Sequence, residues 1–290
     1  MGHIFQQQLA LPRASHSRPP RLRFVYQNQG AATHYRVHHQ IEQAKLAGFD
    51  PVAAPLDARR QLYSLAGADL LYLYRLPLTS RTVPLLLAAR LARIPVVFDS
   101  DDLVWDEDER RYNNLDAHYD AATIVAIVKT ARRLALLMRR VDAFVFATPY
   151  LARLAEQRFH QPAYVNANAV SAAMIAAAEE ACARRVRPDD GPVTIGYFCG
   201  TPRAHDEDFA LVAPVLRVLL DQQPHLRLRC YGDLRIPNAL AVLGPARIER
   251  RSAVRWEELL AHVAEVDITI APLIDNPQRR AKSAVKVLEA

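Results

Sequence analysis

The sequence has few lysines and few cysteines, and it lacks a long apolar run. No apolar stretch approaches the roughly 18 residues of a membrane-crossing helix, so no transmembrane span is predicted. The segment through Pro20 lacks the apolar centre of a secretion signal, and its composition predicts a disordered lead-in over residues 1–20. Cys182, Cys199 and Cys230 form no C-x-x-C spacing. They therefore predict neither a disulfide framework nor a zinc site, and they favour a reducing cytoplasm.

Lysine is scarce, and its placement is uneven. Only four of the 37 basic residues are lysines, and two of these, Lys282 and Lys286, lie within the last nine positions. Ser283 and Glu289 lie beside them in what reads as the start of a helix. Because the other basic residues are almost all arginines, two lysines at this place indicate a requirement for the compact ammonium group. We interpret the closing segment, Asp267–Ala290, as part of a ligand site.

The chain is basic, with a formal net charge of +6 and a pI near 9.4. Its arginines are scattered in pairs, and no basic helix with interleaved aromatic residues stands out. Nucleic acid is therefore not predicted as a partner. The charge instead suits a weak attraction to an anionic membrane surface, as in a peripheral protein at the inner face of a membrane.

Apolar β-rich runs alternate with helix-like stretches along all 290 residues, which is typical of parallel α/β architecture. In the first half the pattern predicts strands at Leu22–Gln27, Pro51–Pro55, Leu70–Arg75, Pro95–Asp99, Ala143–Ala147 and Ala163–Asn166. It predicts helices at Tyr35–Leu46, Val83–Arg93, Ala121–Arg140 and Tyr150–Arg158.

A charged segment rich in Pro and Gly, Glu179–Pro192, interrupts the alternation, which then restarts. The second half is predicted to have strands at Val193–Phe198, Leu226–Tyr231, Arg247–Arg250 and Asp267–Ala271, with helices at Asp206–Asp221, Pro237–Val242, Trp256–Val263 and the carboxyl end. We therefore predict two doubly wound domains, residues 21–178 and 193–290, joined by a linker over 179–192. In such folds ligands bind at the carboxyl ends of the strands, and the cleft between two domains is the default site.

Three junctions between a strand and a helix carry candidate chemistry. In the first, Gly30 opens the helix that carries Arg36. Free backbone N–H groups at such a turn suit an anion, although an ordinary tight connection explains a single glycine as well.

The second junction, residues 96–106, crowds four carboxylates behind a buried strand: Asp99, Asp101, Asp102 and Asp106. Like charges this close need a partner, so we expect a cation, a substrate hydroxyl or an arginine to meet them. Helix capping in a solvated loop is the alternative.

The third junction, residues 195–209, opens the second domain. Gly200, Thr201 and Arg203 follow its first strand and are suited to contact a phosphate. His205-Asp206 then begins the helix, and we interpret this pair as a cap rather than a catalytic dyad.

Taken together, the segments VVFDSDDLVWD, IGYFCGTPRAHDEDF and DITIAPLIDNPQRRAKSAVKVLEA resemble bacterial GT-B glycosyltransferases of the family-4/family-1 type, over about residues 22–290. The resemblance implies two Rossmann-like domains facing a cleft. It also implies transfer of a hexose-type unit, with retention, from a nucleotide sugar to a glycan or polyprenol-linked acceptor in cell-surface polysaccharide synthesis. No metal and no cofactor beyond the nucleotide-sugar co-substrate are implied.

Site residues carry over position by position. The resemblance places the donor against Gly200, Thr201, Arg203, Lys282, Ser283 and Glu289, with Glu289 on the ribose. It assigns catalytic roles to Asp101, Asp102 and Lys286, and it assigns the acceptor side to Gly30, Arg36 and Asp99. Cations and backbone N–H groups would offset the charge that builds on the leaving nucleoside diphosphate.

The chain departs from this family in two places. Ala281 stands where relatives carry a further glutamate that contacts the donor sugar. Relatives also continue past the L-E-A motif through another strand and a closing helix, so the resemblance predicts an incomplete second domain and weak or absent turnover.

Other functions remain open at this point. FDSDD also resembles the first motif of haloacid-dehalogenase-like phosphatases, with Asp99 and Asp101 around Mg²⁺. Asp99-Ser100-Asp101 fits the metal-binding D-x-D of a GT-A glycosyltransferase too. A non-catalytic nucleotide-binding remnant of a GT-B protein is the third alternative.

Overall fold

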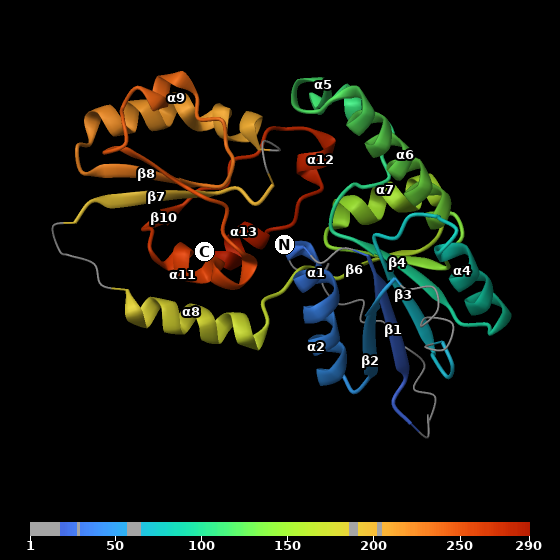
Figure 1. Cartoon of the computed structure of the whole chain (residues 1–290). Helices are drawn as coiled ribbons and strands as arrows, with labels where there is room; N and C mark the ends of the chain where they lie inside the picture. Colours follow the sequence, from blue (N-terminus) through green and yellow to red (C-terminus); the bar gives the residue numbers. More distant parts are fainter. Residues whose placement is uncertain (1–17, 28–29, 57–64, 186–190, 202–204) are drawn as a thin grey trace, which may run out of the picture.

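The computed structural model describes residues 18–27, 30–56, 65–185, 191–201 and 205–290. Two parallel sheets lie side by side, one from each half of the chain (Figure 1). Most of the predicted lead-in, 1–20, lies outside the described residues. Among the helices that are described, none is long and apolar enough to cross a bilayer.

The first sheet has six strands in the order β2-β1-β3-β4-β5-β6. They span β1 Arg21–Tyr26, β2 Asp50–Pro55, β3 Leu70–Tyr74, β4 Val96–Ser100, β5 Ala143–Phe146 and β6 Ala163–Val165. All neighbours pair in parallel. Each strand predicted from the first half is confirmed to within one or two residues, because the central strands are nearly continuous apolar runs buried on both faces.

The helices of the first half connect these strands. They are α1 Ala31–Thr33, α2 His39–Leu46, α4 Thr82–Leu91, α5 Leu115–His118, α6 Ala121–Met138 and α7 Pro149–Phe159, with a 3₁₀ turn, η2, at Glu109–Arg111. Asp120 and Thr148 cap α6 and α7, because their side chains accept from backbone N–H groups three residues on.

The first helix is interrupted by a π-helical turn, η1, at His34–His38 between α1 and α2. This wider turn buries Tyr35, Arg36 and Val37 together. Such turns occur as local distortions of helices, frequently at functional sites. Here it directs a tyrosine and an arginine inward, toward the carboxyl ends of the strands.

The second sheet has four strands in the order β10-β7-β8-β9, all parallel. They are β7 Val193–Phe198, β8 Leu226–Tyr231, β9 Ile248–Arg251 and β10 Ile268–Thr269. The helical elements are α9 Asp206–Gln222, α10 Asn238–Ala241, η3 Trp256–Glu258, α11 Leu259–Ala264, α12 Pro277–Arg280 and α13 Val285–Glu289. The predicted strand over 267–271 is shorter in the structure, because Pro272 follows and only two residues pair with β7.

Between the two sheets the chain forms helix α8, Ala172–Arg184, which packs on α11 (Figure 1). The predicted boundary between residues 178 and 179 falls inside this helix. The reason is local, since an alanine-rich run capped by Ser171 continues the helix through the acidic pair at 179–180. Part of the predicted linker, 186–190, lies outside the described residues.

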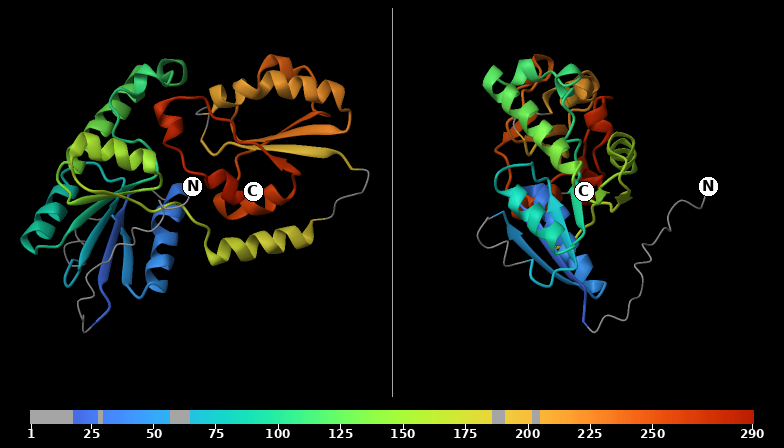
Figure 2. Two further views of the ribbon diagram at one scale, coloured as in Figure 1. Left: turned by 180° about the vertical axis from the view of Figure 1, so that it is seen from behind. Right: turned by 90° about the vertical axis from the view of Figure 1, so that its right-hand side faces the viewer.

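The closing segment passes between the two sheets, with α12 and α13 beside the first domain (Figures 1 and 2). Asn276 donates to Asn113 at 3.0 Å, and the Thr148 hydroxyl donates to the Ala281 carbonyl at 3.3 Å. The carboxyl end of the chain is therefore part of the contact between the domains.

Candidate functional site between the domains

The carboxyl ends of both sheets open on the space between the domains. Strand order reverses beside β1 in the first sheet and beside β7 in the second, and ligands of doubly wound sheets bind at such switch points. A cavity of about 310 Å³ lies there. Its lining comes from both domains: Gly30, Ala31, His34, Phe198, Cys199, Gly200, Tyr231, Val254, Trp256, Glu257, Leu259, Lys286 and Glu289.

Glu289 and Lys286 form one wall of this cavity. The Glu289 side chain is 6% exposed, its Oε1 accepts from the Tyr35 hydroxyl at 2.8 Å, and its Oε2 lies 3.2 Å from Lys286 Nζ. Burial, followed by the charge of Glu289, raises the pKa of Tyr35. The carboxylate predicted for the ribose thus holds a hydrogen bond to the other domain. Tyr35 was not predicted, because nothing local marks a partner 254 residues away.

An aromatic pair closes another side of the cavity. The rings of His34 and Trp256 stack with centroids 3.8 Å apart and planes 6° from parallel. Burial, followed by the neighbouring His38, lowers the pKa of His34, which favours the neutral imidazole. Sequence analysis assigned neither residue to the site. The one available signal was that Trp256 is one of only two tryptophans in the chain.

Of the partners that the sequence left open for the carboxylates after β4, an arginine meets Asp101 and Asp102. Arg75 donates to Asp101 at 2.6 Å and to Asp102 at 2.5 Å, while Lys282 reaches Asp102 from the other domain at 2.6 Å. Arg75 follows β3 and has a left-handed backbone with φ of +48°. Adjacent parallel strands end at one edge, so the position of Arg75 after a predicted strand was the signal that the sequence offered.

The pKa values of Asp101 and Asp102 are shifted in opposite directions. Burial raises the pKa of Asp101, and its like-charged neighbour Asp102 adds to this, although Arg75 opposes it. Burial also opposes ionisation of Asp102, but Arg75 and Lys282 together outweigh it and hold the pKa of Asp102 at about 2. Asp102 is therefore a fixed anion near neutral pH, and Asp101 is the better proton acceptor of the two.

We predict that Asp102 makes folding pH-dependent in acid. Its pKa in the folded protein, about 2, lies below its ordinary value of 3.8, so the folded state binds fewer protons between these values. The stabilisation, about 2 kcal/mol near neutral pH, is therefore lost as pH falls from about 4 to 2. Denaturant unfolding over this range should show a shallower pH dependence for Asp102→Asn than for the native chain. The exposed Asp108→Asn should follow the native profile, and identical profiles for Asp102→Asn and the native chain would refute the assignment.

Arg36 and Asp99 lie in the core rather than on an acceptor surface, which corrects the prediction made for them. Both side chains are 0% exposed. Arg36 Nε donates to Asp99 Oδ1 at 2.9 Å, and the other Asp99 oxygen accepts from the Arg36 guanidinium and from the Tyr72 hydroxyl. A planar guanidinium satisfies a carboxylate at two points, so this pair is neutralised inside the fold and has no surface to offer a ligand.

The same arginine connects the core to the cleft. Its third nitrogen donates to the Asn166 carbonyl at 2.6 Å and to Asn168 Oδ1 at 3.0 Å. Asn168 Nδ2 in turn donates to Ser283 Oγ at 2.8 Å across the domain contact. Ser283 therefore lies at the contact between the domains, where it is held by Asn168, which sequence analysis missed.

Of the three glycines in the loops around the cavity, Gly30, Gly200 and Gly232, only Gly232 is required by the local backbone. At Gly30 and Gly200 an added Cβ would meet nothing within 4 Å, so neither position requires glycine for space. Gly232, just after β8, has φ of +99°, and a Cβ there would lie 2.1 Å from the Cys199 carbonyl oxygen. Gly232 thus allows β8 to end against the loop that carries Gly200.

The remaining loop predictions have mixed outcomes. Thr201 is exposed, and its carbonyl accepts from the Cys199 thiol at 3.0 Å. Arg203 lies outside the described residues. His205 pairs with Asp208 at 2.7 Å, not with Asp206, and Asp208 also accepts from Arg279. These contacts fix the start of α9 to the closing segment.

Ala281 explains one departure from the resembled family. Its side chain is 0% exposed and packs in the core of the first domain. A glutamate in this place would bury a carboxylate among apolar side chains, at a cost of several kcal/mol. Position 281 of the closing segment therefore packs into the first domain, and it does not face a bound sugar.

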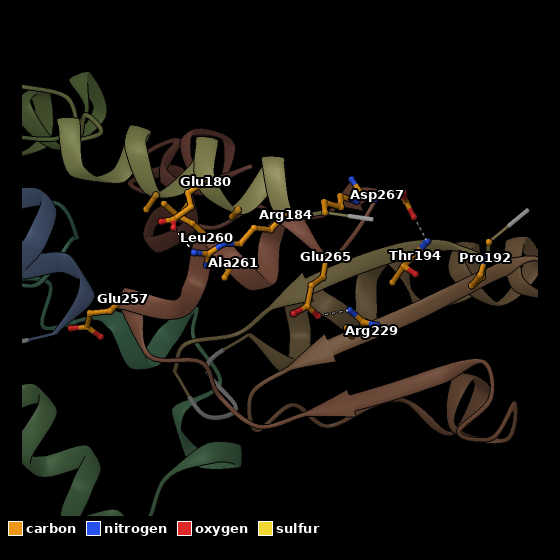
Figure 3. Close-up of a pocket in the computed structure, with 15 residues that line it drawn as sticks. Glu180, Arg184, Pro192, Thr194, Arg229, Glu257, Leu260, Ala261, Glu265 and Asp267 are labelled. Atoms are coloured by element: carbon orange, nitrogen blue, oxygen red, sulfur yellow. Dashed lines mark hydrogen bonds and ion pairs between the residues drawn. The ribbon is translucent and has the colours of Figure 1, made fainter. Parts of the chain in front are cut away.

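A larger hollow, of about 620 Å³, lies between α8, α11 and residues of the central strands β7 and β8 (Figure 3). Six of its charged side chains pair with one another: Arg229 lies 2.9 Å from Glu265, Arg184 contacts Glu180, and Arg185 contacts Asp267. Asp267 also accepts from the Thr194 backbone at 2.7 Å. Because most of the charges that line this hollow are paired within the fold, we assign it no ligand.

The phosphatase alternative loses its nucleophile in this structure. It requires an accessible Asp99, whereas this carboxylate is buried against Arg36 and Tyr72. Among the described residues no cluster of three His, Cys, Asp or Glu side chains is placed to hold a metal ion.

No protein-family model and no curated protein matches the sequence. Solved structures do match in fold. An α,α-trehalose-phosphate synthase (UDP-forming) from Burkholderia vietnamiensis has a TM-score of 0.50 at 10% identity, over 88% of this chain and 79% of that one. An α,α-trehalose 6-phosphate synthase from Burkholderia multivorans has a TM-score of 0.49 at 11% sequence identity, over 91% of this chain and 82% of that one. A UDP-GlcNAc 2-epimerase from Neisseria meningitidis, bound to UDP-GlcNAc, has a TM-score of 0.47 at 11% sequence identity, over 86% of this chain and 76% of that one. The predicted GT-B fold is confirmed.

Proposed function

We propose that this GT-B chain is a glycosyltransferase that moves a hexose-type sugar from a nucleotide-sugar donor to a glycan or lipid-linked acceptor. The observation that carries the proposal is the meeting of Lys286, Glu289 and the Gly200 loop with the Gly30 loop around one interdomain cavity. The similarity in fold to a UDP-forming synthase supports a nucleotide sugar as the donor.

The donor would occupy the wall formed by the second domain. Glu289 offers acceptor oxygens to ribose hydroxyls, and Lys286 offers an ammonium group to the diphosphate. The cavity, about 310 Å³, lies at the small end of the range for ligand sites. Binding would therefore require the cleft to widen, with loss of the Tyr35–Glu289 bond and of the His34–Trp256 stack.

Lys282 would link donor binding to the carboxylates. In the structure it neutralises Asp102 at 2.6 Å. A diphosphate in the cleft would compete for the same ammonium group, and Asp102 would then have an oxygen free for an acceptor hydroxyl. The basic closing segment and the acidic strand end would thus change partners when the donor enters.

The transfer itself would need little covalent chemistry from the protein. The bond from the anomeric carbon to the phosphate oxygen breaks, and its electron pair leaves with the nucleoside diphosphate. The acceptor oxygen bonds to the anomeric carbon, and its proton passes to Asp101 or to the leaving phosphate. Lys282 and Lys286 offset the charge on the leaving group, and alignment in the cleft supplies the rest.

Calorimetric titration with UDP, ADP, GDP and TDP tests this proposal. We expect one diphosphate to bind, and we expect Lys286→Gln to weaken its affinity about 10- to 100-fold, because a charged hydrogen bond contributes roughly 1.5–3 kcal/mol. Lys45→Gln, an exposed lysine on α2, is the matched control and should leave affinity unchanged.

Each other outcome has a definite meaning. Absence of binding to all four diphosphates, or equal loss in the two lysine variants, would contradict the proposed donor site. Nucleotide binding without sugar transfer, when purified chain is given the matching nucleotide sugar and mixed glycan acceptors, would favour the non-catalytic alternative.

A further inference from the structure

Helix α4 has apolar side chains on two faces, although only one of them packs against the protein. Leu85 and Ala89 are buried against the first sheet. Val83, Leu87 and Leu91 recur every fourth residue on the outer face and are 40%, 56% and 86% exposed. A helix that is apolar on all sides is normally buried, so this outer stripe is unusual for a surface helix.

Three arginines lie at the end of this stripe. Arg90, Arg93 and Arg140 line a hollow of about 730 Å³ between the end of α4 and the turn before β5. None of the three forms an ion pair with a residue that the structure describes. The one carboxylate in the lining, Asp142, accepts from the Val96 backbone at 2.7 Å. Arg140 does donate to the Leu136 carbonyl, but no described carboxylate pairs with any of the three, so the hollow has a surplus of positive charge.

Arg93 occupies a position at which glycine is the usual residue. Its φ is +56°, and it directly follows the residue that caps α4. Ile94 N donates to Ala89 O at 2.9 Å, and Arg93 N donates to Arg90 O at 3.2 Å, which is the hydrogen-bond pattern of a Schellman motif. Arginine adopts this left-handed conformation less readily than glycine. The fold thus holds a guanidinium in this place against the backbone preference.

The neighbouring helices add no negative charge. Neither α4 nor α6 contains an acidic residue. A second exposed apolar stripe, Leu211, Val215 and Val218 on α9, provides the contrast. There the first turn is acidic, and Arg217 pairs with Asp221. Of these two stripes, only the one on α4 lies beside arginines that have no ion pair with a described carboxylate.

We propose that Val83, Leu87, Leu91, Arg90, Arg93 and Arg140, together the α4 face, dock on an anionic phospholipid surface. The apolar stripe would enter the headgroup region, and the guanidinium groups would meet lipid phosphates, which they can contact at two points. The face lies at the start of β4, whereas the cleft carboxylates follow its end. Helix α4 also lies on the side of the first sheet away from the second domain (Figures 1 and 2). Docking would leave the interdomain cleft open, and the proposal does not depend on the function assigned to that cleft.

Co-sedimentation of the full chain with vesicles tests the proposal. We expect binding to phosphatidylcholine vesicles that contain phosphatidylglycerol, little binding to phosphatidylcholine alone, and weaker binding at high salt. The triple variant Arg90→Gln/Arg93→Gly/Arg140→Gln should bind the anionic vesicles on the order of 100-fold more weakly, since each basic residue near such a surface contributes about fivefold. Leu87→Gln/Leu91→Gln should also reduce binding.

The controls keep structural damage apart from lost docking. Arg93→Gly alone relieves a left-handed residue, so it should weaken binding without lowering the unfolding temperature. Leu211→Gln/Val218→Gln on α9 should leave binding unchanged. Equal binding to both kinds of vesicle, equal loss from the α9 variant, or no binding to anionic vesicles would overturn the proposal. Binding to a DNA duplex through the same arginines, with no binding to the vesicles, would overturn it in favour of a nucleic-acid partner.

Discussion

Replacing Arg36 by leucine is expected to lower the free energy of unfolding by about 3–5 kcal/mol, because it leaves the fully buried Asp99 carboxylate without its counter-charge. The substitution also removes the donors to Asn166 and Asn168, and with them the hydrogen-bonded chain that reaches Ser283 in the closing segment. Chemical denaturation of the variant and the native chain measures the difference.

A double variant separates charge from packing. Arg36→Leu/Asp99→Leu removes both members of the pair, so no charge is left buried alone, and this variant should be more stable than Arg36→Leu. If Arg36→Leu costs less than about 1 kcal/mol, or if the double variant is the less stable of the two, the pair does not hold the core as described.

Substitution of Gly232 by alanine is expected to destabilise the second domain by about 2–5 kcal/mol, from two causes that act together. A side chain is disfavoured at φ of +99°, and its Cβ would lie 2.1 Å from the Cys199 carbonyl oxygen, which is backbone and cannot rotate away. The loop that carries Gly200 would have to move, so nucleoside-diphosphate affinity should fall as well.

Gly200→Ala is the matched control for this substitution. An added Cβ at Gly200 meets nothing within 4 Å, so stability should change by less than about 0.5 kcal/mol. Thermal or denaturant unfolding of both variants tests the contrast. Equal stability of the two variants would show that Gly232 is not under the constraint described.

The sequence predicted the strands well because their signal is local. β3 and β4 are short, mostly apolar runs, and their carboxyl ends are marked by Arg75 and by the aspartates. Parallel pairing then brings those ends together, so an arginine could be expected beside Asp101 and Asp102. The fold class and one part of the candidate site therefore follow from patterns within a few residues.

Other parts of the site depend on contacts that no local pattern reveals. Tyr35 meets Glu289 across 254 positions, and Asn168 meets Ser283 across 115. The burial of Asp99 could not be predicted either, because the sequence does not distinguish a carboxylate near the buried end of a strand from one in the loop that follows. Helix α8 was missed for a different reason, since its charged second half was interpreted as a linker.

Ala281 has a consequence for how separable the two halves of the chain are. It comes from the closing segment, yet its methyl group completes the apolar core of the first domain. On its own, the first half would expose the apolar surface that this segment covers. Exchange of the second half for that of another GT-B protein would bring in a foreign piece of core, and any bulkier side chain at this position would force the first domain to repack.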